Sequence, residues 1–378
     1  MLKQLKKKVR HVLKPGSYQH LFLHAMPQGL PHITTQLMRQ PIDEKDRQMV
    51  ERIFLSYEKA RNDSPDRQDQ TDMWDLIQTN KHHDLNVILK DADIDALHSY
   101  LADFHQKGLA HGITDFNKAH LPDVSPVMEQ QQRVLVVDTL VAVAEYLGVF
   151  PYQSVDNYIY RDTEEIFNAI QNALSIDIIP PNVDGGIVKV KVGPTWFSYR
   201  EAQALYVAHR VASFKPKKIA EIGGGFGCTT LYAMRFGCQQ YYHYDLPTTN
   251  IAQAWYLYKT GHNVSLYGEP EAEVNIRPYW NFGETTYDVT LNIDSFSELD
   301  ESFVRSYLST MQQATALFFS LNKETEKGYG LVHGGGSERR KHVALCKVVK
   351  DYPAFQRLYR APAWTRKNYV EEVFTIEA

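Results

Sequence analysis

The segment Glu221-Ile222-Gly223-Gly224-Gly225-Phe226-Gly227 decides the fold class of this chain. It follows the strand-like run KKIAEIG and leads into a helix-like run, CTTLYAMRFG. Glycines at such a turn let the backbone bend tightly and approach a ligand with no Cβ atom in the way. A helix that starts directly behind them offers free backbone amides. The segment predicts a ligand-binding strand-turn-helix unit, the alternative being a tight connection without a ligand.

Strand-like and helix-like runs alternate through the rest of the C-terminal half. The strand-like runs are KKIAEIG, YYHYDL, NVSLYG, YDVTLNID and ALFFSLN, with a loop expected between NVSLYG and YDVTLNID. The closing stretch FQRLYRAPAWTRKNYVEEVFTIEA predicts one or two further strands, as an edge hairpin. This alternation is typical of an α/β fold, a doubly wound Rossmann-like domain with a mainly parallel sheet.

The N-terminal half predicts helices instead. Helical runs are expected over 94–104, 126–147 and 163–174, the second starting with a cap residue and proline at Ser125-Pro126 and ending at Gly148. Near residue 176 the pattern changes, because Ile178-Ile179-Pro180-Pro181 disfavours helix. We therefore expect a basic segment at 1–20, a mainly α-helical domain at 21–175 that covers the ligand cleft, and the α/β domain at 176–378.

Composition excludes several classes of protein. The 378 residues include 41 Lys+Arg and 45 Asp+Glu, a net charge of −4, which argues against a nucleic-acid-binding protein. The three cysteines Cys228, Cys238 and Cys346 are widely spaced, which excludes a disulfide scaffold and a multi-cysteine zinc site. They fit a reducing compartment, so we expect a cytoplasmic location. The sequence contains no run of about 18 apolar residues, so it predicts no membrane span.

The first 14 residues concentrate basic charge. Six Lys or Arg residues lie within residues 1–14, well before the first acid, Asp43, and apolar residues recur among them at helical spacing. Such a helix could contact the anionic inner membrane surface peripherally, with each surface-proximal cation contributing about 1 kcal/mol. The alternative is a solvated basic end. Composition leaves the oligomeric state open, and a homo-oligomer is one of the options.

Two acids accompany the glycine segment. Glu221 precedes the glycines, and Asp245 ends the next strand, directly before Leu246. A carboxylate at the second position can accept both hydrogen bonds of a ribose diol. A dinucleotide fingerprint, G-x-G-x-x-G, does not fit, because Cys228 or Thr230 occupies its last position. A nicotinamide oxidoreductase is thus a weaker alternative.

The pattern E-x-G-x-G-x-G resembles in full the first motif of class I S-adenosylmethionine-dependent methyltransferases. The resemblance implies S-adenosyl-L-methionine as cofactor, with its cationic amino-acid end held by Glu221 and its ribose by Asp245. The remaining residues that we expect at the cofactor come from the glycine loop, the adjoining strand ends and the segment leading into the first helix: Gly223, Gly224, Gly225, Gly227, Leu246, Asn292 and Tyr199.

Four phrases within residues 195–374 resemble a family of sugar O-methyltransferases encoded among bacterial cell-surface polysaccharide genes. They are EIGGGFG with YDLP and NIAQAWYL, then LNIDSFSELD, FFSLNKE and RAPAWTRKNYVEEVF. One departure is Lys323, where this family more often has His. The resemblance implies O-methylation of a sugar hydroxyl on a surface polysaccharide or its precursor, hence a carbohydrate acceptor. The alternatives are a non-catalytic scaffold or glycan-binding module and a methyltransferase for a non-sugar metabolite.

A sugar hydroxyl does not ionise near neutrality, so a general base is expected. The candidates follow the fourth and fifth strands: Asp294, Glu298, Glu324 and His333. The first two have the spacing of a helix capping box, Glu324 could be a solvated loop acid, and His333 could belong to an ordinary surface loop. The three acids could also supply oxygen ligands to a metal. No compact metal motif is present, so we expect no metal site.

Overall fold

The computed structural model describes residues 35–37, 43–65, 81–110, 113, 126–150, 163–183, 185, 187–324, 343–366 and 368–377. Its centre is an eight-stranded sheet with strand order β10-β11-β9-β8-β4-β5-β7-β6. The strands are β4 (Lys218–Ile222), β5 (Gln240–Asp245), β6 (Val264–Ser265), β7 (Val274–Pro278), β8 (Tyr287–Ile293), β9 (Thr315–Lys323), β10 (Phe355–Pro362) and β11 (Tyr369–Ile376).

Six of these strands are parallel to their neighbours, from β9 through β8, β4, β5 and β7 to β6. The last two form a hairpin in which β11 pairs antiparallel with β9 and β10 pairs antiparallel with β11. The chain order reverses direction between β4 and β8, which is where the cleft of a doubly wound sheet lies. The predicted doubly wound, Rossmann-like α/β fold is confirmed.

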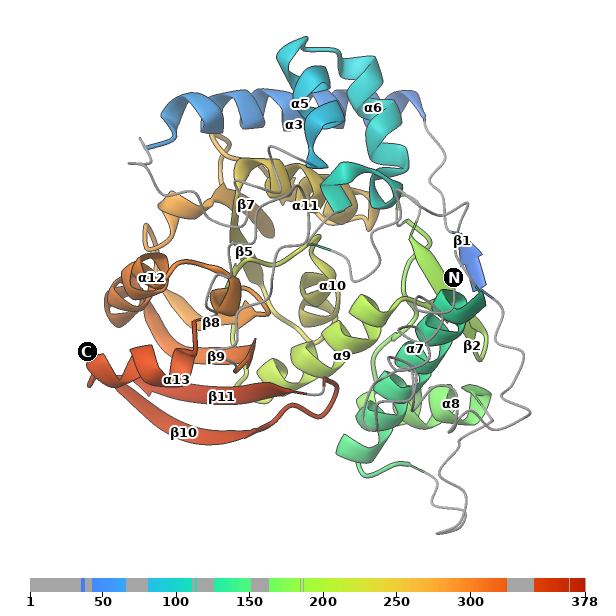
Figure 1. Ribbon diagram of the computed structural model, residues 1–378, viewed down its shortest axis with the longest axis vertical. Helices are drawn as coiled ribbons and strands as arrows, with labels where there is room; N and C mark the ends of the chain where they lie inside the picture. Colours follow the sequence, from blue (N-terminus) through green and yellow to red (C-terminus); the bar gives the residue numbers. More distant parts are fainter. Residues whose placement is uncertain are drawn as a thin grey trace, which may run out of the picture.

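Helices cover both faces of the sheet (Figure 1). One face packs against α9 (Tyr199–Ala212), α10 (Cys228–Arg235) and α11 (Pro247–Lys259), and the other packs against α12 (Glu301–Ala314) and α13 (Leu345–Val348). Alternation along β4 explains the two cores: Ile219 joins the first, while Ala220 and Ile222 join the second.

The sheet contains one strand that the sequence pattern did not predict. Residues expected to form a loop before YDVTLNID instead include β7, which pairs in parallel with β5. This strand is only five residues long and ends in Pro278, so it lacks a long apolar run. Its position between β5 and β6 places Tyr279, the residue after it, at the rim of the cleft.

The N-terminal helices contact the α/β domain in two groups. In Figure 1, α3 (Glu44–Asp63), α5 (His83–Lys90) and α6 (Ile94–Ala102) lie over α11. The short turns η1 (Phe104–Gln106) and η2 (Gly108–Ala110) follow them. The second group, beside α9, comprises α7 (Pro126–Tyr146), α8 (Thr163–Leu174) and a small sheet of β1 (Thr35–Leu37), β2 (Val188–Val192) and β3 (Thr195–Phe197).

The larger core joins residues from both halves of the chain, including Leu97, Ile170 and Val207. The boundary near residue 176 stays a prediction. Within the described part of the chain, no helix is both long and apolar enough to cross a membrane. The predicted basic segment, 1–20, lies outside the described residues.

Candidate functional site

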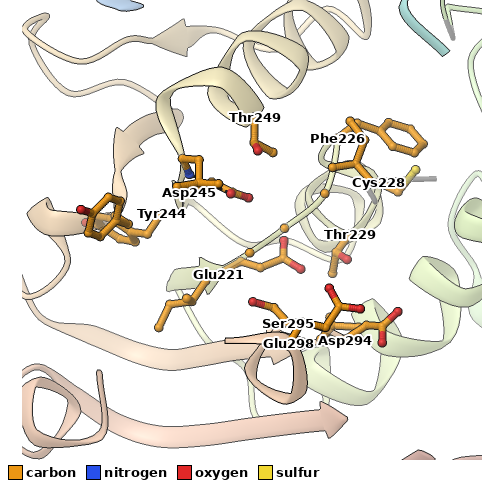
Figure 2. A pocket seen from close by; sticks show the side chains of 18 of the residues that line it. Glu221, Phe226, Cys228, Thr229, Tyr244, Asp245, Thr249, Asp294, Ser295 and Glu298 are labelled. Atoms are coloured by element: carbon orange, nitrogen blue, oxygen red, sulfur yellow. Dashed lines mark hydrogen bonds between the residues drawn. The ribbon is translucent and has the colours of Figure 1, made fainter. Parts of the chain in front are cut away.

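A pocket opens at the carboxyl ends of β8, β4 and β5 (Figure 2). The space within it and at its open mouth amounts to about 1090 Å³. Backbone from the glycine loop forms its floor, and α9 and α12 contribute opposite walls. Its position at the switch point of a doubly wound sheet is where such folds bind ligands.

The glycine loop adopts backbone conformations that require glycine. Gly223, Gly225 and Gly227 have φ values of +72°, +59° and +101°, in the left-handed region. At Gly223 a Cβ atom would lie 2.3 Å from Ser295 Oγ, so only glycine lets the loop after β8 approach this closely. Gly227 caps the N-terminus of α10 and does not line the pocket.

Glu221 lies at the base of the pocket and is almost completely buried. Its Oε2 accepts a hydrogen bond of 2.7 Å from the Tyr241 hydroxyl. Burial raises the pKa of this carboxyl to about 7; the hydrogen bonds from Tyr241 and Thr229 oppose the shift, and the charge of Asp245 adds to it. A cation entering the pocket would find a carboxyl group whose own partners are neutral.

Asp245 ends β5 and lies beside the glycine loop. Its Oδ1 accepts the backbone N–H of Leu246 at 2.8 Å, and its Oδ2 accepts Gln253 Nε2 at 2.9 Å. Burial raises the pKa of this carboxyl to about 7, although these two hydrogen bonds and a third one from Thr249 act to lower it. Because each oxygen retains a further lone pair, the carboxylate can still accept hydrogen bonds from a bound diol.

Two buried asparagines fix the loop that follows β8. Asn292 donates to the carbonyl oxygen of Ile222 at 3.0 Å and accepts from the backbone N–H of Phe296 at 3.0 Å. Asn322, on β9, donates to Asn292 Oδ1 at 2.8 Å and accepts from the backbone N–H of Ser295 at 3.2 Å. Asn292 therefore shapes the pocket without lining it.

Asp294 is held at the pocket by residues from distant parts of the chain. Arg366 donates to its Oδ2 and Tyr369 donates to its Oδ1, while Arg200 Nη1 lies 3.7 Å from Oδ2. The Asp294 backbone has φ of +57°, an uncommon conformation that this network stabilises. Burial and the Asp294 charge raise the pKa of the Tyr369 phenol, which therefore stays a donor. No capping bond from Ser295 is present in the described turn.

The placement of Arg200 follows from the start of α9. Ser198 and Glu201 form a reciprocal capping box, in which the backbone N–H of Ser198 donates to Glu201 Oε2 at 2.7 Å. This cap fixes the first turn of the helix, from which Arg200 reaches the pocket. The sequence pattern missed Arg200 as a site residue, and it identified Arg366 and Tyr369 only as parts of a phrase. Their common target, Asp294, is 72 to 75 residues from the two hairpin residues.

An aromatic wall closes another side of the pocket. Tyr279, from the turn η4 (Tyr279–Asn281), and Phe303, from α12, meet edge to face with ring centroids 6.4 Å apart. Tyr307, one turn further along α12, also lines the pocket. Aromatic rings that line a pocket can stack on a planar ligand group or meet its edge.

The structure brings most of the predicted site residues together. Those lining the pocket are Glu221, Gly223, Gly224, Gly225, Asp245, Leu246, Asp294 and Glu298. Tyr199 is buried beneath the guanidinium of Arg366 and does not line it. Glu324 also lies elsewhere, paired with Arg360 of the edge strand β10. His333 lies outside the described residues.

Metal-ligating side chains do not cluster within the described ranges. No group of three or more His, Cys, Asp or Glu residues there could hold a metal ion. In Figure 2, Asp294, Ser295 and Glu298 gather on one side of the pocket and Asp245 lies apart from them, at the end of β5. The pocket's acids are thus distributed along the sheet edge.

No protein-family model and no curated protein matches this chain. Solved structures do match. The methyltransferase domain of bacterial CtHen1-CN is 15% identical, with a TM-score of 0.35 over 46% of this chain and 97% of that one. The glycopeptide N-methyltransferase MtfA complexed with S-adenosyl-L-methionine is 13% identical, with a TM-score of 0.35 over 46% of this chain and 94% of that one.

A third match is the N-terminal domain of EvdMO1, in the presence of S-adenosylhomocysteine and D-fucose. It is 10% identical, with a TM-score of 0.33 over 46% of this chain and 82% of that one. At such identities and TM-scores, the function has to be inferred from the residues of the pocket.

Proposed function

We propose that this protein is an S-adenosylmethionine-dependent methyltransferase. The observation that carries the proposal is the order of side chains along the sheet edge: Glu221 at the end of β4, Asp245 at the end of β5 and Tyr279 after β7. The cofactor has parts of matching chemistry in the same order, a charged amino-acid end, a ribose diol and a planar adenine.

Each part of the pocket suits its proposed partner. Glu221 would hold the ammonium group, and the glycine loop has no side chains to obstruct the amino-acid end. Asp245 would accept the two hydroxyl groups of the ribose, as carboxylates do at the same place in dinucleotide sites. Tyr279, Phe303 and Tyr307 would contact the adenine ring.

We further propose that the acceptor is a sugar hydroxyl of a bacterial surface polysaccharide or its precursor. Three of the phrases that resemble the sugar O-methyltransferase family contain Asp294, Asn322 and the pair Arg366 and Tyr369. Arg366 and Tyr369 donate to Asp294, and Asn322 accepts from the backbone N–H of the next residue, Ser295, so the three phrases meet at the pocket, which supports a shared role for them.

The chemistry asks little of the protein beyond alignment and proton removal. The bound cofactor supplies a methyl group that is already activated on a sulfonium. Asp294 would accept a hydrogen bond from the acceptor hydroxyl and so orient its oxygen toward that methyl group, and alignment of this kind accounts for about 7–11 kcal/mol of barrier lowering. Asp294 or Glu298 would take the hydroxyl proton as the new oxygen–carbon bond forms.

Titration calorimetry with S-adenosylmethionine, S-adenosylhomocysteine and NADH tests the cofactor assignment. We expect both sulfur nucleotides to bind and NADH not to. If NADH alone binds, the protein is an oxidoreductase. If none of the three binds, the protein is not a methyltransferase, and a non-catalytic scaffold or glycan-binding role replaces the proposed function.

Mass spectrometry of surface polysaccharide from a gene-deletion strain tests the acceptor. The expected result is the loss of one methyl group per repeat unit, restored by the intact gene. Unchanged glycan mass, together with binding of S-adenosylmethionine, would leave a non-sugar metabolite as the acceptor.

A role in surface-glycan assembly is compatible with a cytoplasmic enzyme that contacts the inner membrane through residues 1–14. Co-sedimentation with anionic liposomes, with and without residues 1–15, tests this contact. Equal binding of the two proteins would leave the basic residues as a solvated end.

A further inference from the structure

His243 lies directly behind Glu221, outside the set of residues that line the pocket. It is on β5, opposite Glu221 in the parallel register, and its ring is completely buried. Nε2 lies 2.6 Å from Thr230 Oγ1, on α10. Nδ1 lies 3.9 Å from Glu221 Oε2 and has no hydrogen-bond partner within the described residues.

Gly224 preserves the space between these two polar atoms. A Cβ atom at this position would lie 2.6 Å from His243 Nδ1 and 2.8 Å from Glu221 Oε2. Unlike its neighbours in the loop, Gly224 has no positive φ that would require glycine. The structural reason for glycine here is the close approach of the histidine and the acid to the loop.

One protonation state satisfies these polar atoms without a buried charge. If Nε2 donates to Thr230, then Nδ1 is an acceptor, and it faces a carboxyl oxygen that is also an acceptor. If the proton is on Nδ1 instead, the same pair of atoms, 3.9 Å apart, would have to hold a buried carboxylate charge, which burial disfavours. A protonated Glu221 resolves the conflict, because a small movement lets its O–H donate to Nδ1.

The surroundings of Glu221 favour this neutral state. From β5, the phenol of Tyr241, the ring of His243 and the carboxyl group of Asp245 face it, and from α10 the hydroxyl of Thr229 does. Burial lowers the pKa of His243 to about 3, so the ring stays neutral. The charged groups on the other walls of the pocket are Arg200, Asp294 and Glu298.

We propose that His243 is a positioning residue for Glu221: in the empty pocket it accepts a hydrogen bond from the protonated carboxyl group, and an arriving ammonium ion displaces that proton. The O–H bond of the carboxyl group breaks, the proton passes to the solvent, and the carboxylate then pairs with the ammonium ion. This rests on the proposed function, which supplies the ammonium group as the amino-acid end of the cofactor.

Proton release on binding of S-adenosylhomocysteine tests the coupling. Calorimetry at pH 7 in buffers of different ionisation enthalpy gives the number of protons released. Because the pKa of Glu221 is raised to about 7, a fraction of this residue is protonated at pH 7, and we expect a measurable fraction of a proton to be released from it. Asp245 has a similar pKa and adds its own contribution, which Glu221→Gln leaves in place.

Two variants should shift the release in opposite directions. Tyr241→Phe removes a donor that favours the carboxylate, so more protons should be released at pH 7. His243→Leu removes the acceptor that favours the protonated form, so fewer should be released, and the affinity at pH 6 should rise relative to the wild type. General destabilisation cannot produce opposite shifts. Equal proton release in all three proteins would overturn the role of His243.

Infrared spectroscopy of the ligand-free protein separates this inference from the proposed function. We expect a protonated-carboxyl band that is lost in Glu221→Gln and shifts in His243→Leu. If S-adenosylhomocysteine fails to bind while this band is present, the proposed function fails but the pairing of Glu221 with His243 holds. If the ligand binds and the band is absent in the wild type, the pairing alone is wrong.

Discussion

The acids at the ends of β4 and β5 differ from the acid at the end of β8 in what compensates their charge. Glu221 is buried and Asp245 is half-buried among neutral hydrogen-bond donors, and the pKa of each is raised to about 7. Asp294 instead accepts bonds from the guanidinium of Arg366 and the phenol of Tyr369. One side of the pocket is short of positive charge, whereas the other side supplies its own.

The difference indicates how the two sides would divide the work. A carboxyl group without a cation gains most from a ligand that brings one, which suits a cofactor with an ammonium group. A carboxylate already held by two donors is fixed in position, which suits the alignment of an uncharged hydroxyl. The predictions below test this division from the largest expected effect to the smallest.

Replacement of the compensated acid should affect turnover and spare cofactor binding. With Asp294 as the general base, we expect Asp294→Asn to lower methyl transfer to the identified acceptor by about 10²–10⁴-fold, since the amide cannot accept the hydroxyl proton; a much smaller loss would assign the base to Glu298. Affinity for S-adenosylhomocysteine, measured by calorimetry, should be nearly unchanged. Glu324→Gln is the control, because Glu324 is paired with Arg360 away from the pocket and its loss should leave turnover intact. Equal losses of turnover in the two variants would contradict a specific role of Asp294 in methyl transfer.

A methyl group at Gly224 should damage the uncompensated side. The added carbon would overlap with Glu221 and His243, and overpacking of this kind costs about 1–3 kcal/mol, or about 5- to 150-fold in affinity. Calorimetry with S-adenosylhomocysteine measures the loss. Gly237→Ala is the matched control: its φ of +97° makes it strained, but no atom lies within 4 Å of the added carbon. We expect Gly237→Ala to lower the stability of the fold and to leave the affinity for S-adenosylhomocysteine unchanged.

Removal of the second uncompensated acid should lower the affinity for the cofactor by about tenfold or somewhat more. Asp245→Ala deletes the carboxylate proposed to accept two hydrogen bonds from the ribose, each worth about 1 kcal/mol. Asp288→Ala is a suitable comparison, because Asp288 accepts the backbone N–H groups of Lys217 and Lys218 at the other end of the sheet. Unchanged binding in Asp245→Ala would show that the ribose lies elsewhere.

The pH dependence of stability should reveal the same two acids. Because their folded-state pKa values are raised above those of the unfolded chain, the stability they contribute is fully present below about pH 4 and is lost as the pH rises through about 7. We expect the melting temperature of the ligand-free protein to fall between pH 5 and pH 8. In the double variant Glu221→Gln with Asp245→Asn, this fall should be smaller by several degrees. An identical loss in this double variant would mean that the acids are ionised in the empty pocket.

The sequence was sufficient for the local features of this site. The glycine loop and its acids are contiguous or one strand apart, so a local pattern reveals them, and their strand ends meet because the sheet is parallel. The network around Asp294 was not predictable in this way, because its partners lie 72 and 75 residues further along the chain. The role of Asn292 in shaping the loop likewise depends on Asn322 from the neighbouring strand.

The expectations that failed have similar causes. β7 was missed because its five residues end in a proline and show no apolar run. Tyr199 was expected at the cofactor from its place before the first strand, yet its ring is buried under Arg366, a residue whose position no local pattern fixes. Side-chain direction at a helix start depends on what packs there, and here the C-terminal hairpin does.

The position of β11 has a consequence for the synthesis of the protein. Among the described residues it is the last strand in chain order, yet it lies inside the sheet, between β9 and β10. A growing chain can form the glycine loop and its acids early, but β9 keeps an open edge and Asp294 lacks both partners until residues 366–376 have left the ribosome. Nascent chains would therefore form the glycine-loop side of the pocket before the Asp294 side, and a chaperone would have a reason to cover β9 in the interval.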